Sequence, residues 1–423
     1  MSVFYNSIKI NLILAFLSKV SSLIASFLFI PILLKGLGLE SYGTWVTLSS
    51  IAAWLLFFDF GLGNSFKNIV AEGNKDKIIK AYSLAISLYL YVSLFLVCCF
   101  FVFILLNNSS IENQSAVILL YIPLCLLFPL SLFGFGIQGL RLVGINAIID
   151  ALRVFIWILL SVSYIYLVEN KYLYILSLIF VLANIIPQML QLIVFKIKCD
   201  FSLRINLVSP LAIIKEDSFK LAIRFFVIQM SSLVSFNLGN ILIYNYFSSA
   251  DVALYDVYNK VFLAGLSIFN MTIAVLWPEI TKAYFNGDLK LCQNLYRKIS
   301  FIAIIFSFGV LVVAFKFELL LEILTLNNLL VVDTNLLWSI AILTILQAVA
   351  YCGAVVLNAT NELRLQMLVS ITSIFLIYPI FLILLNLNFG VMSYTVATTC
   401  LVLFAAILYN VVVPKILKVS YVD

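Results

Sequence analysis

The sequence predicts an all-α integral membrane protein with twelve transmembrane helices. Apolar residues make up 64% of the 423 residues and charged residues only 10%, and the mean hydropathy is +1.17. No soluble domain could bury that much apolar surface. Apolar runs of about 20 residues, the length that crosses a bilayer, recur along the chain. Basic residues gather in alternate connections between these runs, as they do in multi-pass membrane proteins.

Twelve apolar runs are long enough to be spans. The first run is too long for the apolar core of a signal peptide and lacks a small-residue cleavage site, so we expect it to remain as a span. The approximate limits of the runs are 11–34, 44–66, 81–106, 115–138, 146–167, 173–195, 220–246, 253–277, 299–322, 335–357, 365–386 and 391–413.

The basic residues predict the orientation of these spans. Of the 25 Lys and Arg residues, 18 lie in the termini and connections of one side, three lie on the opposite side, and four lie inside spans. The positive excess marks the cytoplasmic side, so both termini are predicted to be cytoplasmic. The net charge of +6 follows from this topology and from contact with lipid headgroups, and requires no nucleic acid.

The spans divide into two sets of six. The longest connection, residues 196–219, is basic and is predicted to be a cytoplasmic linker between an N-terminal bundle (1–195) and a C-terminal bundle (220–423). The halves show weak similarity at an offset of 210 residues, where Phe16 and Ser21 match Phe226 and Ser231. An even number of spans in each half predicts a parallel repeat, a common plan in transporters.

Spans one and seven each carry a small or polar face. Close helix packing through small residues explains most of such a face, but it does not explain a Lys, Gln or Asn in the same stripe. A central polar cavity explains those residues better, and both readings can hold. The residues at helical spacing are Ala15, Ser18, Lys19, Ser22, Ala25 and Ser26 in span one, and Gln229, Ser232 and Asn240 in span seven.

Four cations lie inside predicted spans, where a charge costs at least about 2.5–3.5 kcal/mol unless it faces a polar cavity or a partner. Arg224 is near the cytoplasmic end of its span and can snorkel to the interface. Lys19 has no acidic residue on its own span, and its alternatives are a cross-helix pair with Asp59 or contact with an anionic substrate.

The other two cations have acidic residues at helical spacing. Arg153 follows Asp150 by three positions, and Lys260 follows Asp256 by four, so each can form an intrahelical pair. A phosphate could displace a carboxylate from its cation, and the released carboxylate could take up a proton. Asp59, Asp150 and Asp256 are therefore candidate sites for a coupling ion, and the sequence does not choose among them.

Several chemistries are absent from the sequence. There is no histidine and no G-x-x-x-x-G-K-[ST] loop, which excludes His-based catalysis and ATP hydrolysis by a phosphate loop. The seven cysteines lack metal-site spacing and are not predicted to form disulfides, so no metal and no cofactor is expected. The predicted outside loops are too short for a catalytic domain, so we do not expect an enzyme.

The segment from Pro31 to Ser65 resembles a known family. The residues that carry the resemblance are Pro31, Leu37-Gly38, Glu40, Tyr42-Gly43 and Trp45, and then Asp59 and Gly61-Leu62-Gly63. This pattern resembles the start of Wzx-type O-antigen and polysaccharide flippases in the multidrug/oligosaccharidyl-lipid/polysaccharide (MOP) exporter superfamily. The second half departs from the pattern, with Ala253 where glycine is common.

The resemblance implies a fold and a function. The fold would be two six-helix bundles in a MATE-like V shape that opens alternately to each side. The cargo would be an undecaprenyl-diphosphate-linked oligosaccharide, the O-antigen repeat unit, moved from the cytoplasmic to the periplasmic leaflet of the bacterial inner membrane. Other polysaccharide-assembly membrane proteins would be partners, and a proton or sodium gradient could drive transport. The alternative is a cation-coupled multidrug exporter of the same superfamily.

The diphosphate gives the intramembrane cations a physical role. A diphosphate that crosses hydrocarbon needs charge compensation, which Lys or Arg in a wet cavity can provide. The candidate substrate-binding residues of such a cavity are Lys19, Asp59, Arg153, Arg224, Gln229, Asn240 and Lys260. Lys19, on the serine-rich face of the first span, is the strongest candidate for contact with phosphate.

Overall fold

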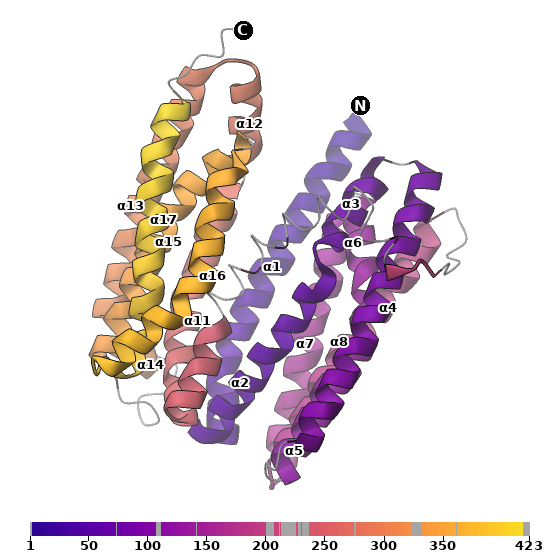
Figure 1. Ribbon diagram of the computed structural model, residues 1–423, viewed down its shortest axis with the longest axis vertical. Coiled ribbons are helices and arrows are strands. Elements are labelled where there is room, and N and C mark those ends of the chain that lie inside the picture. Colours follow the sequence, from indigo (N-terminus) through magenta and orange to yellow (C-terminus); the bar gives the residue numbers. More distant parts are fainter. Residues whose placement is uncertain are drawn as a thin grey trace. The chain divides into compact units, whose positions relative to one another are not determined.

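The computed structural model is built of helices that group into two compact units, residues Met1–Gln229 and Met230–Asp423. Figure 1 traces the helices of both units. The structure describes residues 2–72, 74–106, 111–140, 142–199, 207–210, 212, 226, 230, 237–274, 276–323, 332–360 and 362–417.

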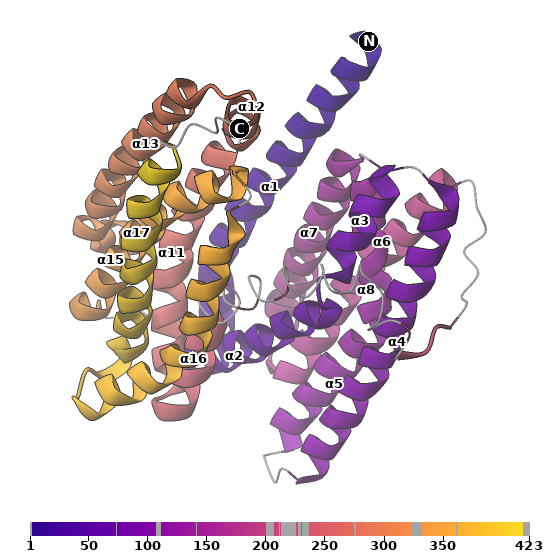
Figure 2. The ribbon, with the colours of Figure 1, turned by 45° about the horizontal axis from the view of Figure 1, so that its top comes forward.

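The N-terminal unit is a bundle of long helices joined by short ones. Helix α1 packs along α7. Helix α8 packs against both α5 and α7 (Figure 2). The short helices α3 and α6 pack against each other. The elements are α1 (Ser2–Leu37), α2 (Leu39–Leu55), η1 (Leu56–Asp59), α3 (Leu62–Glu72), α4 (Lys75–Leu106), α5 (Ile111–Leu127), η2 (Phe128–Ser131), α6 (Leu132–Gly139), α7 (Val143–Leu167) and α8 (Leu173–Lys198).

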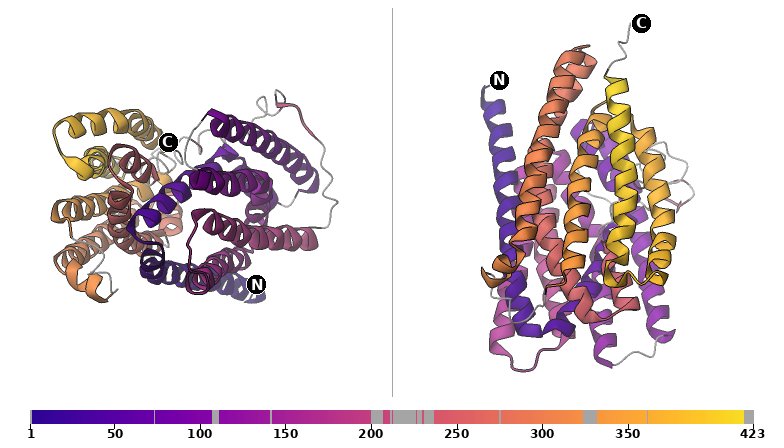
Figure 3. Two further views of the ribbon diagram at one scale, coloured as in Figure 1. Left: turned by 90° about the horizontal axis from the view of Figure 1, so that it is seen from below. Right: turned by 90° about the vertical axis from the view of Figure 1, so that its left-hand side faces the viewer.

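The C-terminal unit is organised around α15, which packs against α11, α13 and α17. In the right-hand view of Figure 3 the long helices of this unit, orange to yellow, run alongside one another. Residues 237–246 are also helical. The remaining elements are α11 (Ser249–Ala274), α12 (Trp277–Phe285), α13 (Leu289–Phe315), α14 (Phe317–Ile323), α15 (Thr334–Ala359), α16 (Leu363–Asn386), η3 (Gly390–Met392) and α17 (Ser393–Ile416).

The outer surfaces of these helices are apolar, as expected of helices in contact with lipid. Large side chains such as Leu159 (67% exposed), Phe308 (69%) and Phe375 (73%) lie on the surface. Several hydroxyl groups within the helices bond the backbone of the preceding turn, as the hydroxyl of Thr344 does to the carbonyl of Ile340 at 2.8 Å. The all-α membrane fold predicted from composition is therefore confirmed.

Ten helices in the described part of the chain are long and apolar enough to cross a membrane. They coincide with ten of the twelve predicted spans. The predicted span 220–246 lies largely outside the described residues, so its limits and those of the linker 196–219 stay predictions.

The second predicted span, 44–66, is not a continuous helix, so its crossing of the membrane stays a prediction. The chain leaves the α-helix after Leu55, makes a short 3₁₀ turn and begins a new helix at Leu62. Phe60 and Gly61 have positive φ angles of 48° and 76°, which a right-handed helix cannot contain. Hydropathy alone did not reveal the break, because the apolar run of α2 and η1 extends up to it, and the polar residues of α3 lie beyond it.

Candidate functional site

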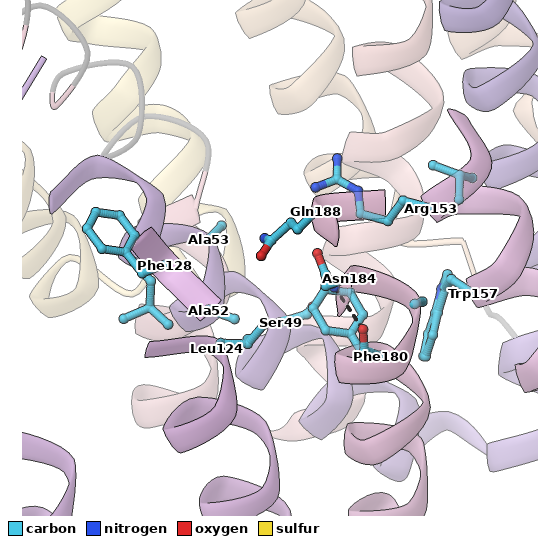
Figure 4. Close-up of a pocket in the computed structure, with 13 residues that line it drawn as sticks. Ser49, Ala52, Ala53, Leu124, Phe128, Arg153, Trp157, Phe180, Asn184 and Gln188 are labelled. Carbon is cyan, nitrogen blue, oxygen red and sulfur yellow. Dashed lines mark hydrogen bonds between the residues drawn. The ribbon is translucent and has the colours of Figure 1, made fainter. Parts of the chain in front are cut away.

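A cavity of about 280 Å³ lies inside the N-terminal unit, between residues of α2, α5, η2, α7 and α8 (Figure 4). Its lining is mostly apolar with a few polar groups, the composition typical of small-molecule sites. The lining residues are Ser49, Ala52, Ala53, Leu55, Leu124, Phe128, Arg153, Val154, Trp157, Phe180, Ala183, Asn184 and Gln188.

Arg153 is the one charged side chain among these lining residues. It lies on α7, one turn before Trp157, and Figure 4 shows its side chain extending toward Gln188 and Asn184. Its guanidinium makes no hydrogen bond to another side chain within the described ranges. The cavity therefore carries a positive charge on a largely apolar wall.

Asp150, the acidic neighbour of Arg153, is held by amides. The Asn146 side-chain nitrogen donates to one carboxylate oxygen at 2.9 Å, and the Gln191 side-chain nitrogen donates to the other at 3.2 Å. Gln191 also donates to the Asn146 oxygen at 3.0 Å. Within the part of the chain that the structure describes, Arg153 and Asp150 form no close ion pair, and the carboxylate lies outside the cavity lining. The intrahelical pair predicted for Arg153 is therefore not formed, because the hydrogen bonds of the Asp150 carboxylate come from Asn146 and Gln191.

A glycine on α6 makes room for this amide network. A Cβ atom on Gly134 would stand 3.2 Å from the Gln191 amide nitrogen and 3.4 Å from the Asn146 oxygen. Contacts that short require the neighbouring groups to shift. The close approach of α6 therefore helps to fix the position of both amides, and through them of Asp150.

Three uncharged polar groups line the cavity beside Arg153. The Asn184 amide donates to the Phe180 carbonyl at 2.7 Å, and the Ser49 hydroxyl donates to the Val46 carbonyl at 2.9 Å. The side-chain oxygen of Gln188 is buried and accepts no hydrogen bond from the described residues. A buried acceptor without a donor is costly, and such groups occur where a ligand or water completes them.

An aromatic cluster forms the wall next to Arg153. The indole of Trp157 stacks on that of Trp45, with ring centroids 5.2 Å apart and planes 21° apart. Phe180 packs edge-on to Trp157 at 5.3 Å, and Phe29 does so at 6.1 Å. These contacts leave Trp157 little freedom to move, so the cavity wall is preorganised.

Asp59 lies at the break between α2 and α3, and its side chain is 4% exposed. Its carboxylate accepts a hydrogen bond from the Gly61 backbone nitrogen at 2.8 Å, which fixes the turn. The buried hydroxyl of Tyr89 lies within electrostatic range of the same carboxylate. Asp59 thus has a structural role in shaping the break.

Lys19 lies on α1 with an exposed side chain. Within the described ranges it forms no ion pair with Asp59, so that alternative for Lys19 is not realised. The small residues of its face bond within the helix, as the Ser22 hydroxyl does to the Ser18 carbonyl at 2.7 Å. Contact with an anionic substrate stays a prediction for Lys19.

In the C-terminal unit, Lys260 and Asp256 form the predicted intrahelical ion pair on α11. The Lys260 nitrogen lies 2.7 Å from the carboxylate of Asp256, and the side chains are 42% and 5% exposed. Asn240 is buried, 5% exposed, in the helical segment before α11. Arg224 and Gln229 lie outside the described residues.

The sequence reasoning missed the amides and the aromatic wall. Asn184, Gln188 and Gln191 follow i, i+4 and i+7 spacing on α8, and they form a polar stripe in an apolar span. This stripe is visible in the sequence, but its members are uncharged and stand out less than a cation does in an apolar span. Asn146 and Trp157, which flank Asp150 and Arg153 on the same face of α7, were overlooked for the same reason.

Comparisons with known proteins connect this architecture to a family. Residues 8–284 match the profile of the family described as "Polysaccharide biosynthesis protein", whereas no curated protein sequence matches the chain. Several solved structures share the fold. An inward-facing multidrug resistance MATE family transporter of the MOP superfamily has a TM-score of 0.73, 14% identity and coverage of 94% of this chain and 96% of its own.

Two further solved structures have a similar fold. An outward-facing MATE family transporter of the MOP superfamily has a TM-score of 0.68 and 14% identity, covering 97% of this chain and 96% of its own. A MATE protein in complex with MaL6 has a TM-score of 0.67 and 14% identity, covering 98% of both chains. Because the family profile spans most of the sequence and the fold is that of MOP-superfamily transporters, the chain belongs to the polysaccharide biosynthesis protein family.

Proposed function

We propose that this protein is a flippase for lipid-linked oligosaccharides. In this proposal it moves an undecaprenyl-diphosphate-linked O-antigen repeat unit from the cytoplasmic to the periplasmic leaflet of the bacterial inner membrane by alternating access. The family match over residues 8–284 is the observation that carries the proposal. The fold of MOP-superfamily transporters supplies a transport mechanism for a polysaccharide-related family.

The cationic cavity of the N-terminal unit supports an anionic cargo. Arg153 brings a positive charge into an apolar wall, where it would repel a cationic drug and attract an oxyanion. The carboxylate of Asp150 is engaged by two amide groups and lies outside the lining. This arrangement favours the flippase over the alternative, a cation-coupled multidrug exporter, which the resemblance to MATE transporters otherwise suggests.

Transport against a gradient needs an energy source, which we propose is a proton or sodium gradient rather than a bound cofactor. Asp59, Asp150 and Asp256 are the candidate groups. Asp256 is paired with Lys260 and Asp150 is bonded to amides, whereas Asp59 takes a backbone hydrogen bond at a helix break. Asp59 is the candidate best placed to couple ion binding to backbone geometry.

Loss of the gene tests the proposal. A deletion strain should accumulate lipid-linked repeat units on the cytoplasmic leaflet and lose surface polysaccharide, and the intact gene should restore both. Lys19→Ala and Lys260→Ala should abolish surface polysaccharide while the protein still inserts into the membrane. If the deletion strain keeps its surface polysaccharide and becomes sensitive to cationic drugs instead, the exporter is the better description.

A further inference from the structure

We propose that an exposed tyrosine pair of the C-terminal unit, Tyr246 and Tyr378, is a binding site for a neutral sugar ring of the cargo. This inference rests on the proposed function, since it gives the transported oligosaccharide a contact on the protein. The pair lies on two segments with almost no charge. No acidic or basic residue occurs in the helical segment 237–246, and the charged residue of α16 is Arg364, next to its first residue.

The two tyrosines meet through their hydroxyl groups. The oxygens of Tyr246 and Tyr378 lie 2.7 Å apart, and both rings pack against Phe381, with centroids 5.3 Å and 6.4 Å from its ring. Phe381 is buried at 0% exposure, whereas the two tyrosines are 42% and 43% exposed. The buried phenylalanine thus holds both tyrosine rings at an open surface of the unit.

The pair leaves one hydroxyl proton without an acceptor. Each tyrosine has one O–H group, and only one of the two protons can lie between the two oxygens. Neither hydroxyl has another hydrogen-bond partner among the described residues. The pair can therefore donate one hydrogen bond to a ligand and accept another from it.

The proline next to Tyr378 frees a backbone acceptor. Pro379 lies inside α16 and has no N–H, so the carbonyl of Phe375, one turn earlier, lacks its helical hydrogen bond. This carbonyl lies below the Pro379 ring, and the ring is exposed. The same exposed side of α16 therefore offers a hydroxyl donor and a carbonyl acceptor within about one helical turn.

The depth of the pair argues against a role as interfacial anchor. Tyrosines at the ends of spans form an aromatic belt at the level of the lipid headgroups. Tyr378 lies eight residues before Asn386, the last residue of α16, which is about 12 Å along the helix axis. In hydrocarbon, an unpaired hydroxyl and a freed carbonyl would find no partner, and this costs free energy. A polar ligand on this face satisfies both groups.

A neutral sugar ring matches these groups. Its hydroxyls can donate to the Phe375 carbonyl and accept from the free tyrosine proton, while its apolar C–H face packs on an exposed aromatic ring. A lipid tail offers neither donor nor acceptor. An anion would find no cation on this part of α16. The chemistry of the face therefore fits a pyranose of the oligosaccharide.

Thiol accessibility distinguishes a polar path from a face that is covered by lipid. In a cysteine-free protein in nanodiscs, Leu382→Cys places a thiol one turn after Tyr378 and leaves the tyrosine pair intact. We expect a water-soluble methanethiosulfonate to modify this thiol. Phe308→Cys, at a 69% exposed position of the apolar surface of α13, is the control and should not react. A Leu382→Cys protein that is equally unreactive would show that lipid covers the face, which overturns the inference.

Saturation-transfer NMR of the full-length protein in nanodiscs measures the sugar contact itself. The probes are cellobiose, a neutral sugar, and glycerol, a polyol without a ring. We expect saturation of the cellobiose ring protons that Tyr378→Leu reduces about fivefold. Tyr378→Phe keeps the ring and loses the hydroxyl, so it should reduce the signal about twofold. Tyr166→Phe makes the same change at a 76% exposed tyrosine and should leave the signal unchanged.

A second variant tests the freed carbonyl. Pro379→Ala supplies the missing helical N–H, so it should reduce the cellobiose signal about twofold without lowering the unfolding temperature. Thermal unfolding identifies any variant that fails to fold. Because Pro379→Ala removes a helix-breaking residue, it keeps the test decisive even if Tyr378→Leu does not fold.

Three NMR results overturn the inference. They are the absence of a cellobiose signal from the intact protein, an equal signal from the folded Tyr378→Leu variant, and a glycerol signal with the same dependence on Tyr378. Failure of the site can be told apart from failure of the proposed function. A strain that carries Tyr378→Leu and flips its lipid-linked cargo normally contradicts this site only, whereas a deletion strain with unaltered polysaccharide contradicts the flippase itself.

Discussion

Two glutamines of the N-terminal unit differ in the hydrogen bonds that their side chains form. Gln188 and Gln191 lie one turn apart on α8. Gln191 donates to both Asn146 and Asp150, whereas the oxygen of Gln188 is buried without a donor beside the cavity. Gln191 is thus part of a hydrogen-bond network within the protein, whereas the side-chain oxygen of Gln188 can accept a hydrogen bond from a ligand.

This difference predicts opposite effects of the same substitution. Gln191→Leu removes a donor from the buried Asp150 carboxylate and should lower the free energy of unfolding by about 1–3 kcal/mol. Gln188→Leu removes an unsatisfied oxygen and should leave stability unchanged or raise it slightly. Thermal unfolding in detergent measures both, and each variant is the matched control of the other. Equal destabilisation by the two would show that the hydrogen bonds of Gln191 contribute no more to stability than the side chain of Gln188 does.

A second prediction at the residue scale concerns the coupling energy of the Lys260–Asp256 ion pair. The carboxylate is buried and the ammonium is 42% exposed, so the pair is partly screened by its surroundings. A double-mutant cycle with Lys260→Gln and Asp256→Asn should give a coupling energy of about 1 kcal/mol. Detergent unfolding of the four proteins provides the cycle. A coupling energy near zero would mean that the close contact does not stabilise the folded protein.

Charged residues could be predicted from the sequence better than amides could. A cation inside a span is conspicuous, and Arg153 was identified with Asp150 as its neighbour on the helix. Asn146 lies four positions before Asp150 on α7, but Gln191 comes from α8, and the sequence of one span does not show which residues of another helix it meets. The same applies to the stack of Trp45 on Trp157, whose members are 112 positions apart.

At the scale of elements, the interruption between α2 and α3 is the main departure from a simple bundle. Apolar composition predicts where a helix crosses the membrane, but not whether its backbone is continuous. The break depends on Phe60 and Gly61 with positive φ, and on the hydrogen bond from Gly61 to Asp59. The pair of glycines at 61 and 63 was visible in the sequence, yet glycine is also common in continuous membrane helices.

The break gives an element-scale prediction. Gly61→Ala places a side chain at φ +76° and should destabilise the protein by about 1–2 kcal/mol. Gly309 lies in the α-helix α13 with open space around its missing Cβ, so Gly309→Ala should be neutral or stabilise by up to about 1 kcal/mol. The shift in unfolding temperature reports both changes. A harmless Gly61→Ala would show that the turn adapts easily.

At the scale of the whole molecule, the sequence predicted the membrane class and most spans because these properties sum over many residues. Errors at single positions average out over a span of about 20 residues. Errors in the positions of helix ends do not cancel in this way. Helix α4 begins at Lys75, six residues before the predicted span, because the backbone hydrogen bonding of a helix continues past the end of its apolar run.

The predicted orientation can be tested with two acidic surface positions. In a cysteine-free background, Asp76→Cys, near the start of α4, should resist a membrane-impermeant maleimide applied to intact cells. Glu169→Cys, between α7 and α8, should react. Both side chains are exposed, and neither change alters the number of basic residues that determine topology. If only Asp76→Cys reacts, the orientation of the protein is opposite to the predicted one.

The stacked indoles beside the cavity have an optical consequence. Two chromophores held 5.2 Å apart with planes 21° apart share their electronic excitation, and such coupling produces paired bands of opposite sign in circular dichroism. One member of the pair, Trp157, belongs to the cavity wall, while the other, Trp45, lies behind it. Any movement of the wall would change the interaction between the two transition dipoles. The circular dichroism of this indole pair should therefore report movement of the cavity wall.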